Sequence, residues 1–424
     1  MAKRFLINVG SVTGARVFVV LSQVLVLPVV ARYLAVEDFG DIALAMTVVI
    51  FANLLSDGGL SRSLIRRNSY DRTEWSSVFW FLVLVGIGLG AILMAIAPLW
   101  EWMFTRPKLG EMVTVLAVFP LLYSVAAVPN ARMECDDRFP TIAMIQATGA
   151  LAGIATAIIL AVQGAGAWAL VWQQIVLGAT QCVLSLTFGR FRPMALWRRV
   201  PLGDHLVFAR NSLAVSVLLT GQRQAPTMMI GYALGANPLG LFAMSQRLLN
   251  LPQQGLAGPS GQVVFVRMSA AQDSPERLPQ VYLGSVRLLA LAVFPPMAVI
   301  AGIGDTALPL LLSEPWREVA TIFALAAPGI ALETATYTSD MVFQAVNRTG
   351  LRLRLVAERS ILKLAAIAVA LPFGLNAVAL AITLSAVAYM PRLWAQMRLV
   401  IRLDNRSALL ALCLLYTSPS PRDQ

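Results

Sequence analysis

The sequence is poor in charged residues and has few of the side chains that build metal centres or disulfide frameworks. Charged residues make up 13% of the 424 positions, against roughly 25% in a soluble domain. Three cysteines, Cys135, Cys182 and Cys413, are too scattered for a disulfide framework or a metal site, and His205 is the single histidine. We therefore expect neither a metal nor a cofactor.

Apolar residues are abundant instead. They make up 58% of the chain, and a mean hydropathy of +0.72 indicates many membrane spans rather than one globular core. A span needs about 20 largely apolar residues. Candidate segments run approximately over 8–33, 41–60, 76–97, 112–130, 141–162, 166–188, 206–233, 239–265, 283–303, 318–338, 357–373 and 375–399. The sequence thus predicts an all-α polytopic membrane protein with about twelve transmembrane helices, the first an uncleaved span rather than a signal peptide.

Basic residues gather in every second loop between these spans. Arg62, Arg66, Arg67 and Arg72 follow the second span, and Arg190, Arg192, Arg198 and Arg199 follow the sixth, whereas the opposite loops hold only Arg32, Arg106, Lys108 and Arg317. The positive-inside rule then places both ends of the twelve-span core in the cytoplasm. The net charge of +11 therefore has a membrane explanation, and we expect no nucleic-acid partner.

A weak internal repeat divides the chain. The segment from Leu34 to Gly40 matches the segment from Leu234 to Gly240, at an offset of 200 residues. Two parallel six-span repeats imply a pseudo-two-fold axis along the membrane normal and a central cavity between two lobes. We predict an N-terminal lobe over 1–189, a cytoplasmic linker over 190–205 and a C-terminal lobe over 206–407. The Pro- and Ser-rich end, 408–424, is interpreted as a truncated span or an artefactual tail.

Polar side chains inside the predicted spans indicate a lined cavity. Arg247, Asn250 and Gln254 have the spacing i, i+3, i+7, which puts them on one helix face, and Arg16 and Gln23 are also seven residues apart. In the seventh span, Arg223 belongs to a stripe with Ser212, Ser216, Thr220 and Thr227. Snorkelling to a head group is the alternative for Arg16, and helix–helix packing is the alternative for the stripe.

Glu333 is the only acid well inside a late span, and Thr336, Tyr337 and Asp340 share its face. Because carboxylates inside membranes often form relays, Glu333 is a candidate for binding a coupling cation or proton. The alternative is a buried ion pair with an arginine. Lys363 lies near the cytoplasmic end of its span and is expected to snorkel.

Short motifs recur in order along the predicted spans: Pro28-x-x-Ala31-Arg32-x-Leu34-x4-Phe39-Gly40, Asp57-Gly-Gly59-Leu60, Arg66-Arg67, Gly231-x-x-Leu234-Gly235-x3-Leu239-Gly240-x-Phe242, Leu310 to Trp316 and Ala345-x-Asn347-Arg348. In this order they resemble the oligosaccharide flippases of the multidrug/oligosaccharidyl-lipid/polysaccharide exporter superfamily, over roughly residues 5–402.

A narrower likeness is to the peptidoglycan lipid flippase. The run from Arg247 to Pro252 is similar to a pattern of that protein whose arginine lines the central cavity. The chain has Ser22 and Gln23 where that protein has an acidic neighbour, and we expect it to lack the two extra spans of that protein, so the polysaccharide branch is favoured.

This resemblance implies a flippase that moves a polyprenyl-diphosphate-linked oligosaccharide from the cytoplasmic to the periplasmic leaflet of a bacterial inner membrane, for surface polysaccharides such as O-antigen or exopolysaccharide. Arg16, Arg223 and Arg247 would neutralise the diphosphate, and Gln23, Asn250 and Gln254 would bind sugar hydroxyls. A polysaccharide polymerase and an initiating phosphosugar transferase are implied as possible partners, beside membrane lipid. Since no ATP-binding motif is present, a gradient, the substrate supply or another subunit must provide the energy.

Two other functions compete with this prediction. A cation-coupled drug or small-molecule antiporter on the same scaffold would need acids in the first lobe, and none lies deep in spans one, two or four to six. A membrane glycan polymerase or ligase needs catalytic groups, often on a large external loop, whereas the predicted external loops are short. We therefore expect that the protein is not an enzyme.

Overall fold

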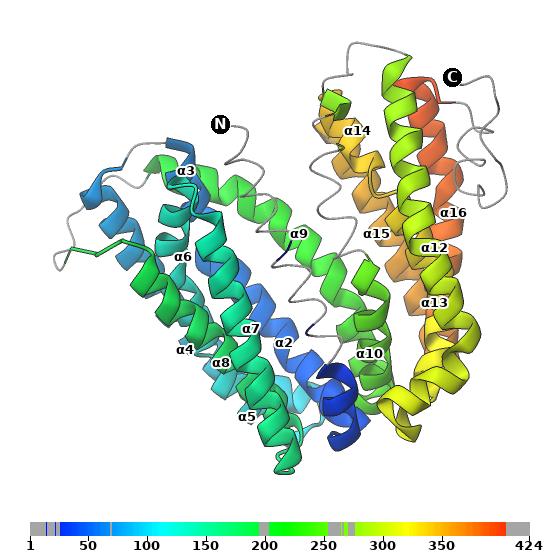
Figure 1. Ribbon diagram of the computed structural model, residues 1–424, viewed down its shortest axis with the longest axis horizontal. Coiled ribbons are helices and arrows are strands. Elements are labelled where there is room, and N and C mark those ends of the chain that lie inside the picture. Colours follow the sequence, from blue (N-terminus) through cyan, green and yellow to red (C-terminus); the bar gives the residue numbers. More distant parts are fainter. Residues whose placement is uncertain are drawn as a thin grey trace. The chain divides into compact units, whose positions relative to one another are not determined.

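A computed structural model describes residues 14, 22, 26–67, 70–194, 203–252, 264, 267–269 and 276–403 (Figure 1). Within these ranges every regular element is helical. The α-helices are α2 (Val36–Asp57), α3 (Leu60–Arg67), α4 (Arg72–Phe104), α5 (Pro107–Leu116), α6 (Phe119–Cys135), α7 (Phe139–Val162), α8 (Ala167–Phe188), α9 (Gly203–Leu234), α10 (Ala236–Pro252), α12 (Arg277–Leu312), α13 (Glu318–Ala335), α14 (Ser339–Ala345), α15 (Thr349–Ala370) and α16 (Leu375–Ile401), and two short 3-10 turns cover Glu314–Trp316 and Leu371–Phe373.

The described helices are those of a multi-pass membrane protein. Among them, eight segments are long and apolar enough to cross a bilayer: Val36–Ile65, Arg72–Phe104, Pro107–Cys135, Phe139–Val162, Ala167–Phe188, Arg277–Leu312, Glu314–Ala345 and Leu375–Ile401. Each contains or closely matches one predicted span. Helices α9 and α15 cover most of two more predicted spans, and α10 covers part of another, while the first predicted span lies mostly outside the described residues. Large apolar side chains such as Leu84, Ile92 and Leu384 are exposed, as expected of a surface that faces lipid.

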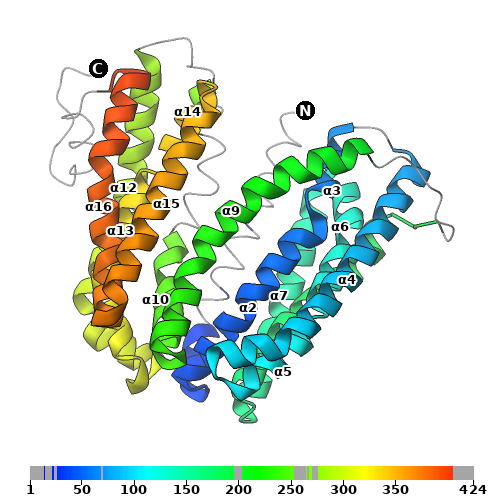
Figure 2. The same ribbon diagram turned by 180° about the vertical axis from the view of Figure 1, so that it is seen from behind.

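Contacts divide the chain into two compact units, Met1–Ala243 and Met244–Gln424. In the first unit α7 packs along α8, α4 packs on α6, and α9 packs on α2 and α3; Figure 2 shows α9 beside α2. A Cβ atom at Gly86 of α4 would lie 2.7 Å from the hydroxyl oxygen of Ser124 of α6, so the two helices approach closely where one lacks a side chain. The predicted division into lobes at a linker over 190–205 stays a prediction.

The first turns of α2 and α10, both within the first unit, meet backbone to backbone. A Cβ atom at Gly40 would overlap the carbonyl group of Ala236, and a Cβ atom at Gly240 would overlap the carbonyl group of Val36. The two contacts are related by the same offset of 200 residues that relates the sequence repeat. Only glycine allows such an approach at either position.

In the second unit α13 packs against both α12 and α16, and α15 packs on α16. Its core contains Tyr282, Val286, Phe343, Tyr389 and Met390. Hydroxyl groups connect the helices inside this core: the hydroxyls of Tyr282 and Ser339 lie 2.9 Å apart, and Ser285 donates to Thr338 at 3.0 Å. In a membrane such hydrogen bonds replace the water that would otherwise satisfy these groups.

Candidate functional site

The predicted cavity residues are only partly described. Arg16, Gln23, Gln254 and the side chain of Ser212 lie outside the described residues. Arg223 on α9 and Arg247 on α10 are both exposed, and Asn250 is half-buried one turn after Arg247. Ser216, Thr220 and Thr227, the stripe on α9, are half-buried. Because Arg223 and Arg247 belong to different units, the predicted cavity between two lobes stays a prediction.

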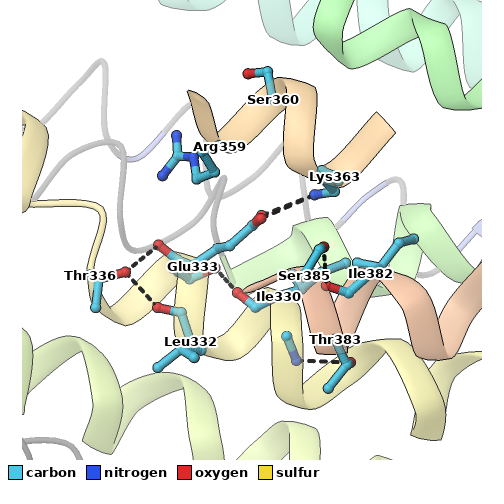
Figure 3. A network of polar contacts seen from close by, with 12 residues as sticks. Ile330, Leu332, Glu333, Thr336, Arg359, Ser360, Lys363, Ile382, Thr383 and Ser385 are labelled. Atoms are coloured by element: carbon cyan, nitrogen blue, oxygen red, sulfur yellow. Dashed lines mark hydrogen bonds and ion pairs between the residues drawn. The ribbon is translucent and has the colours of Figure 1, made fainter. Parts of the chain in front are cut away.

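Glu333 at the end of α13 forms an ion pair with Lys363 of α15 (Figure 3). The lysine Nζ lies 3.2 Å from Oε1 and 3.1 Å from Oε2 of the carboxylate, so one ammonium group binds both oxygens. The lysine side chain is 26% exposed and the glutamate side chain 21% exposed. The expected snorkelling of Lys363 is therefore wrong, because its ammonium group is drawn to the carboxylate. The alternative of an ion pair at Glu333 is correct in kind, but its cation is a lysine and not an arginine.

A second pair of opposite charges lies next to the first. Arg359, one helical turn before Lys363, has its Nη2 atom 4.0 Å from Oδ2 of Asp340, and both side chains are half-buried. Arg352 lies seven residues before Arg359, on the same face of α15. Its Nε atom is buried and has no hydrogen-bond partner in the described structure. We call the side chains of Arg352, Arg359 and Lys363 the α15 cation row. This row has three positive charges, against the two negative charges of Glu333 and Asp340.

A proline inside α13 precedes Glu333, and a side chain of α16 binds the backbone next to it. Pro328 has no N–H group, and the N–H group of the next residue, Gly329, donates to the hydroxyl of Thr383 at 3.1 Å. That hydroxyl donates in turn to the carbonyl oxygen of Leu325 at 2.6 Å. Thr383 of α16 therefore bridges a donor and an acceptor that a regular helix would join directly, one turn before Glu333.

In the first unit, Arg106 binds two acids of α2. Its Nε atom donates to Asp41 and its Nη2 atom donates to Glu37, both at 3.1 Å. Partial burial opposes the charge of Arg106, but the carboxylates of Asp41 and Glu37 outweigh it and raise the pKa of the guanidinium group. The sequence predicts Arg106 in an external loop, but the spacing of its charges does not indicate that Asp41 and Glu37 are its partners. No group of three or more histidine, cysteine or acidic residues in the described part of the chain could hold a metal ion.

Comparison with protein families decides the identity of this helical fold. The family model described as "Polysaccharide biosynthesis protein" matches residues 29–321. The chain belongs to the polysaccharide biosynthesis protein family. One of the curated relatives described below is named as a transport protein.

Curated members of the family are distant relatives. The chain is 22% identical to the lipopolysaccharide biosynthesis protein WzxC of Escherichia coli K12, over 70% of this chain and 61% of the relative. It is 22% identical to the succinoglycan biosynthesis transport protein ExoT of Rhizobium meliloti, over 73% and 63%, and 20% identical to the teichuronic acid biosynthesis protein TuaB of Bacillus subtilis, over 66% and 59%. The chain thus spans about three fifths of the length of the curated relatives it matches.

Solved structures of the superfamily share the fold. The lipid II flippase MurJ in an inward closed conformation aligns with a TM-score of 0.75 at 11% identity, covering 98% of this chain and 94% of MurJ. An inward-facing multidrug resistance MATE transporter aligns with a TM-score of 0.73 at 15% identity, covering 92% and 98%. At these identities the likeness concerns the fold alone, and it confirms the superfamily fold that the sequence motifs predicted.

Proposed function

We propose that the protein is a flippase that moves a polyprenyl-diphosphate-linked oligosaccharide from the cytoplasmic to the periplasmic leaflet of a bacterial inner membrane. The observation that carries this proposal is the exposure of Arg223 and Arg247 on α9 and α10, which cover predicted spans of a chain that belongs to a polysaccharide biosynthesis family. A charged side chain within a membrane is costly, so an exposed arginine there indicates an anionic ligand or a water-filled space. The relatives named for lipopolysaccharide, succinoglycan and teichuronic acid biosynthesis support a glycan cargo.

The chemistry of the cargo suits these side chains. The diphosphate that joins glycan to lipid must cross an apolar slab as an anion. A guanidinium group offers a planar fork of fixed charge, which matches phosphate oxygens. In the proposed twelve-span arrangement, with both ends cytoplasmic, Arg16, Arg223 and Arg247 neutralise the diphosphate, while Gln23, Asn250 and Gln254 bind sugar hydroxyls. Rocking of two six-helix lobes then alternates access to the two leaflets. A glycan polymerase and an initiating phosphosugar transferase act on the same lipid-linked cargo.

Periplasmic access to the lipid-linked glycan tests this function. In cells depleted of the protein, a glycan-modifying enzyme confined to the periplasm should no longer reach the glycan, and total lipid-linked glycan should accumulate. Wild-type protein should restore access, whereas Arg247→Ala and Arg223→Ala variants present at wild-type levels should not. Arg287→Ala is the matched control, because Arg287 is an exposed arginine of α12 outside the proposed set. Unchanged access after depletion contradicts the flippase and leads to transport assays with cationic dyes, which test the antiporter.

A further inference from the structure

The α15 cation row points to an anion site that the proposed cavity residues do not include. Its members come from one helix face, and its acidic partners come from α13 and α14. We propose that Lys363 and Arg359 form a second binding site for a diphosphate-type oxyanion. In this proposal the diphosphate of the cargo replaces the carboxylate of Glu333 as the partner of Lys363. This inference rests on the proposed function and deepens it, because it assigns a cargo contact within the second unit alone.

The exposure of the ion pair allows such an exchange. Both partners are partly buried, so their attraction is stronger than it would be on a soluble surface. However, the lysine is 26% exposed and the glutamate 21% exposed, which leaves the pair open to a competing anion. The neighbouring pair is looser still, since Arg359 and Asp340 are separated by 4.0 Å. Two cations thus stand one turn apart, within reach of a single polyanionic head group.

The charge balance also favours an incoming anion. The cation row has three positive side chains against the two carboxylates of Glu333 and Asp340. The buried Nε atom of Arg352 lacks a hydrogen-bond partner in the described structure. Buried donors without partners are costly. An oxyanion at Lys363 and Arg359 would balance the extra charge of this helix face.

The identity of the cation matters for exchange. Lysine carries a compact charge on a flexible stem, so its ammonium group can turn from one acceptor to another with little rearrangement. Arg106 shows the opposite arrangement, because its fixed fork holds two acids at 3.1 Å each. We therefore interpret the Arg106 cluster as a permanent connection, and the Lys363 pair as an exchangeable one.

Binding of citronellyl diphosphate, a short-chain analogue of the lipid carrier, tests the exchange. The purified full chain in lipid nanodiscs is titrated with this ligand, and citronellol serves as the uncharged control. Glu333→Gln removes the competing carboxylate and should tighten binding roughly tenfold, the scale of one charge-assisted hydrogen bond in a partly exposed site. Lys363→Gln should weaken binding by a similar factor. In the double variant the gain from Glu333→Gln should vanish, because the freed ammonium group is absent.

A purely structural pair gives a different pattern. If the pair only connects α13 to α15, each single variant should lower the thermal unfolding midpoint, and neither should tighten binding. Equal or weaker binding by a folded Glu333→Gln variant overturns the proposal. Should that variant fail to fold, Glu333→Asp keeps the charge but lengthens the pair; it should tighten binding by a smaller factor, and unchanged binding again overturns the proposal. Arg287→Gln should leave the affinity unaltered. Wild-type protein that does not bind the diphosphate contradicts the proposed function itself, whereas wild-type binding without tightening contradicts only this inference.

Discussion

The hydroxyl of Thr383 accepts a hydrogen bond from the N–H group of Gly329 across the contact between α16 and α13. The same hydroxyl donates to the carbonyl oxygen of Leu325. A single side chain therefore binds two backbone groups of α13 beside Pro328, a residue that has no N–H group of its own. Glu333, which binds Lys363, lies one turn further along α13.

Replacing Thr383 with valine should destabilise the second unit. Valine has nearly the same shape but no hydroxyl, so the N–H of Gly329 and the carbonyl of Leu325 lose their partner at a cost of roughly 1–3 kcal/mol. The thermal unfolding midpoint of purified protein should fall. Thr383→Ser retains the hydroxyl and should stay close to the wild type. Equal midpoints for the valine and serine variants would show that the backbone of α13 does not need the hydroxyl of α16.

Alanine at Gly40 or Gly240 should force α2 and α10 apart. Each added Cβ atom would overlap a backbone carbonyl group, which cannot move aside as a flexible side chain can. We expect destabilisation of about 1–3 kcal/mol for either variant, the usual cost of overpacking. The matched control is Gly88→Ala on α4, where an added Cβ has no neighbour within 4 Å. That change should be neutral or slightly stabilising, because alanine favours a helix more than glycine does. A thermal shift of the same sign in all three variants contradicts the close approach.

Asp41 should contribute more to stability than Glu37, although both bind Arg106. The Asp41 side chain is 12% exposed and the Glu37 side chain 53% exposed. Exposed pairs are worth roughly 0–1 kcal/mol, so Glu37→Gln should change the unfolding midpoint little. Arg106→Ala should cost more than Glu37→Gln because it leaves the carboxylate of Asp41 buried without its cation. The double variant Arg106→Ala, Asp41→Asn should recover part of the loss. Additive losses in the double variant would exclude a direct interaction.

The membrane spans were predictable from the sequence because a run of apolar residues determines its own helix in lipid. The expected span 141–162 compares with the helix Phe139–Val162, and the expected span 166–188 compares with Ala167–Phe188. The partner of Glu333 was not predictable in the same way. Lys363 lies 30 residues away, and only the packing of the second unit decides which charges meet. The position of Lys363 near the end of a predicted span favoured snorkelling, because that reasoning considers a single helix and not the neighbours packed against it.

The glycine contacts show a middle case. The repeat of Leu34–Gly40 in Leu234–Gly240 was visible in the sequence, and it suggested that the two segments occupy equivalent places. In the structure Gly40 lies against Ala236, and Gly240 lies against Val36. The repeat does not predict these contacts, because a repeat does not indicate which surfaces touch. Likewise, the spacing of Arg247 and Asn250 predicted a shared face, but a spacing cannot state what that face meets.

Arg247→Lys separates the charge of Arg247 from the shape of its guanidinium group. If Arg247 binds the diphosphate as a fork, lysine keeps the charge but loses one of two parallel hydrogen bonds, which costs roughly a factor of ten in affinity. Periplasmic access to the glycan should therefore be lower than in the wild type and higher than in Arg247→Ala. Asn250→Ala should show a smaller loss, since a neutral sugar contact is weaker than a charged one. Full activity of Arg247→Ala would remove Arg247 from the cargo site, and equal loss in the lysine and alanine variants would indicate that geometry rather than charge is limiting. The amount of folded protein in the membrane is measured for each variant, and a loss of access at wild-type amounts can then be attributed to cargo binding.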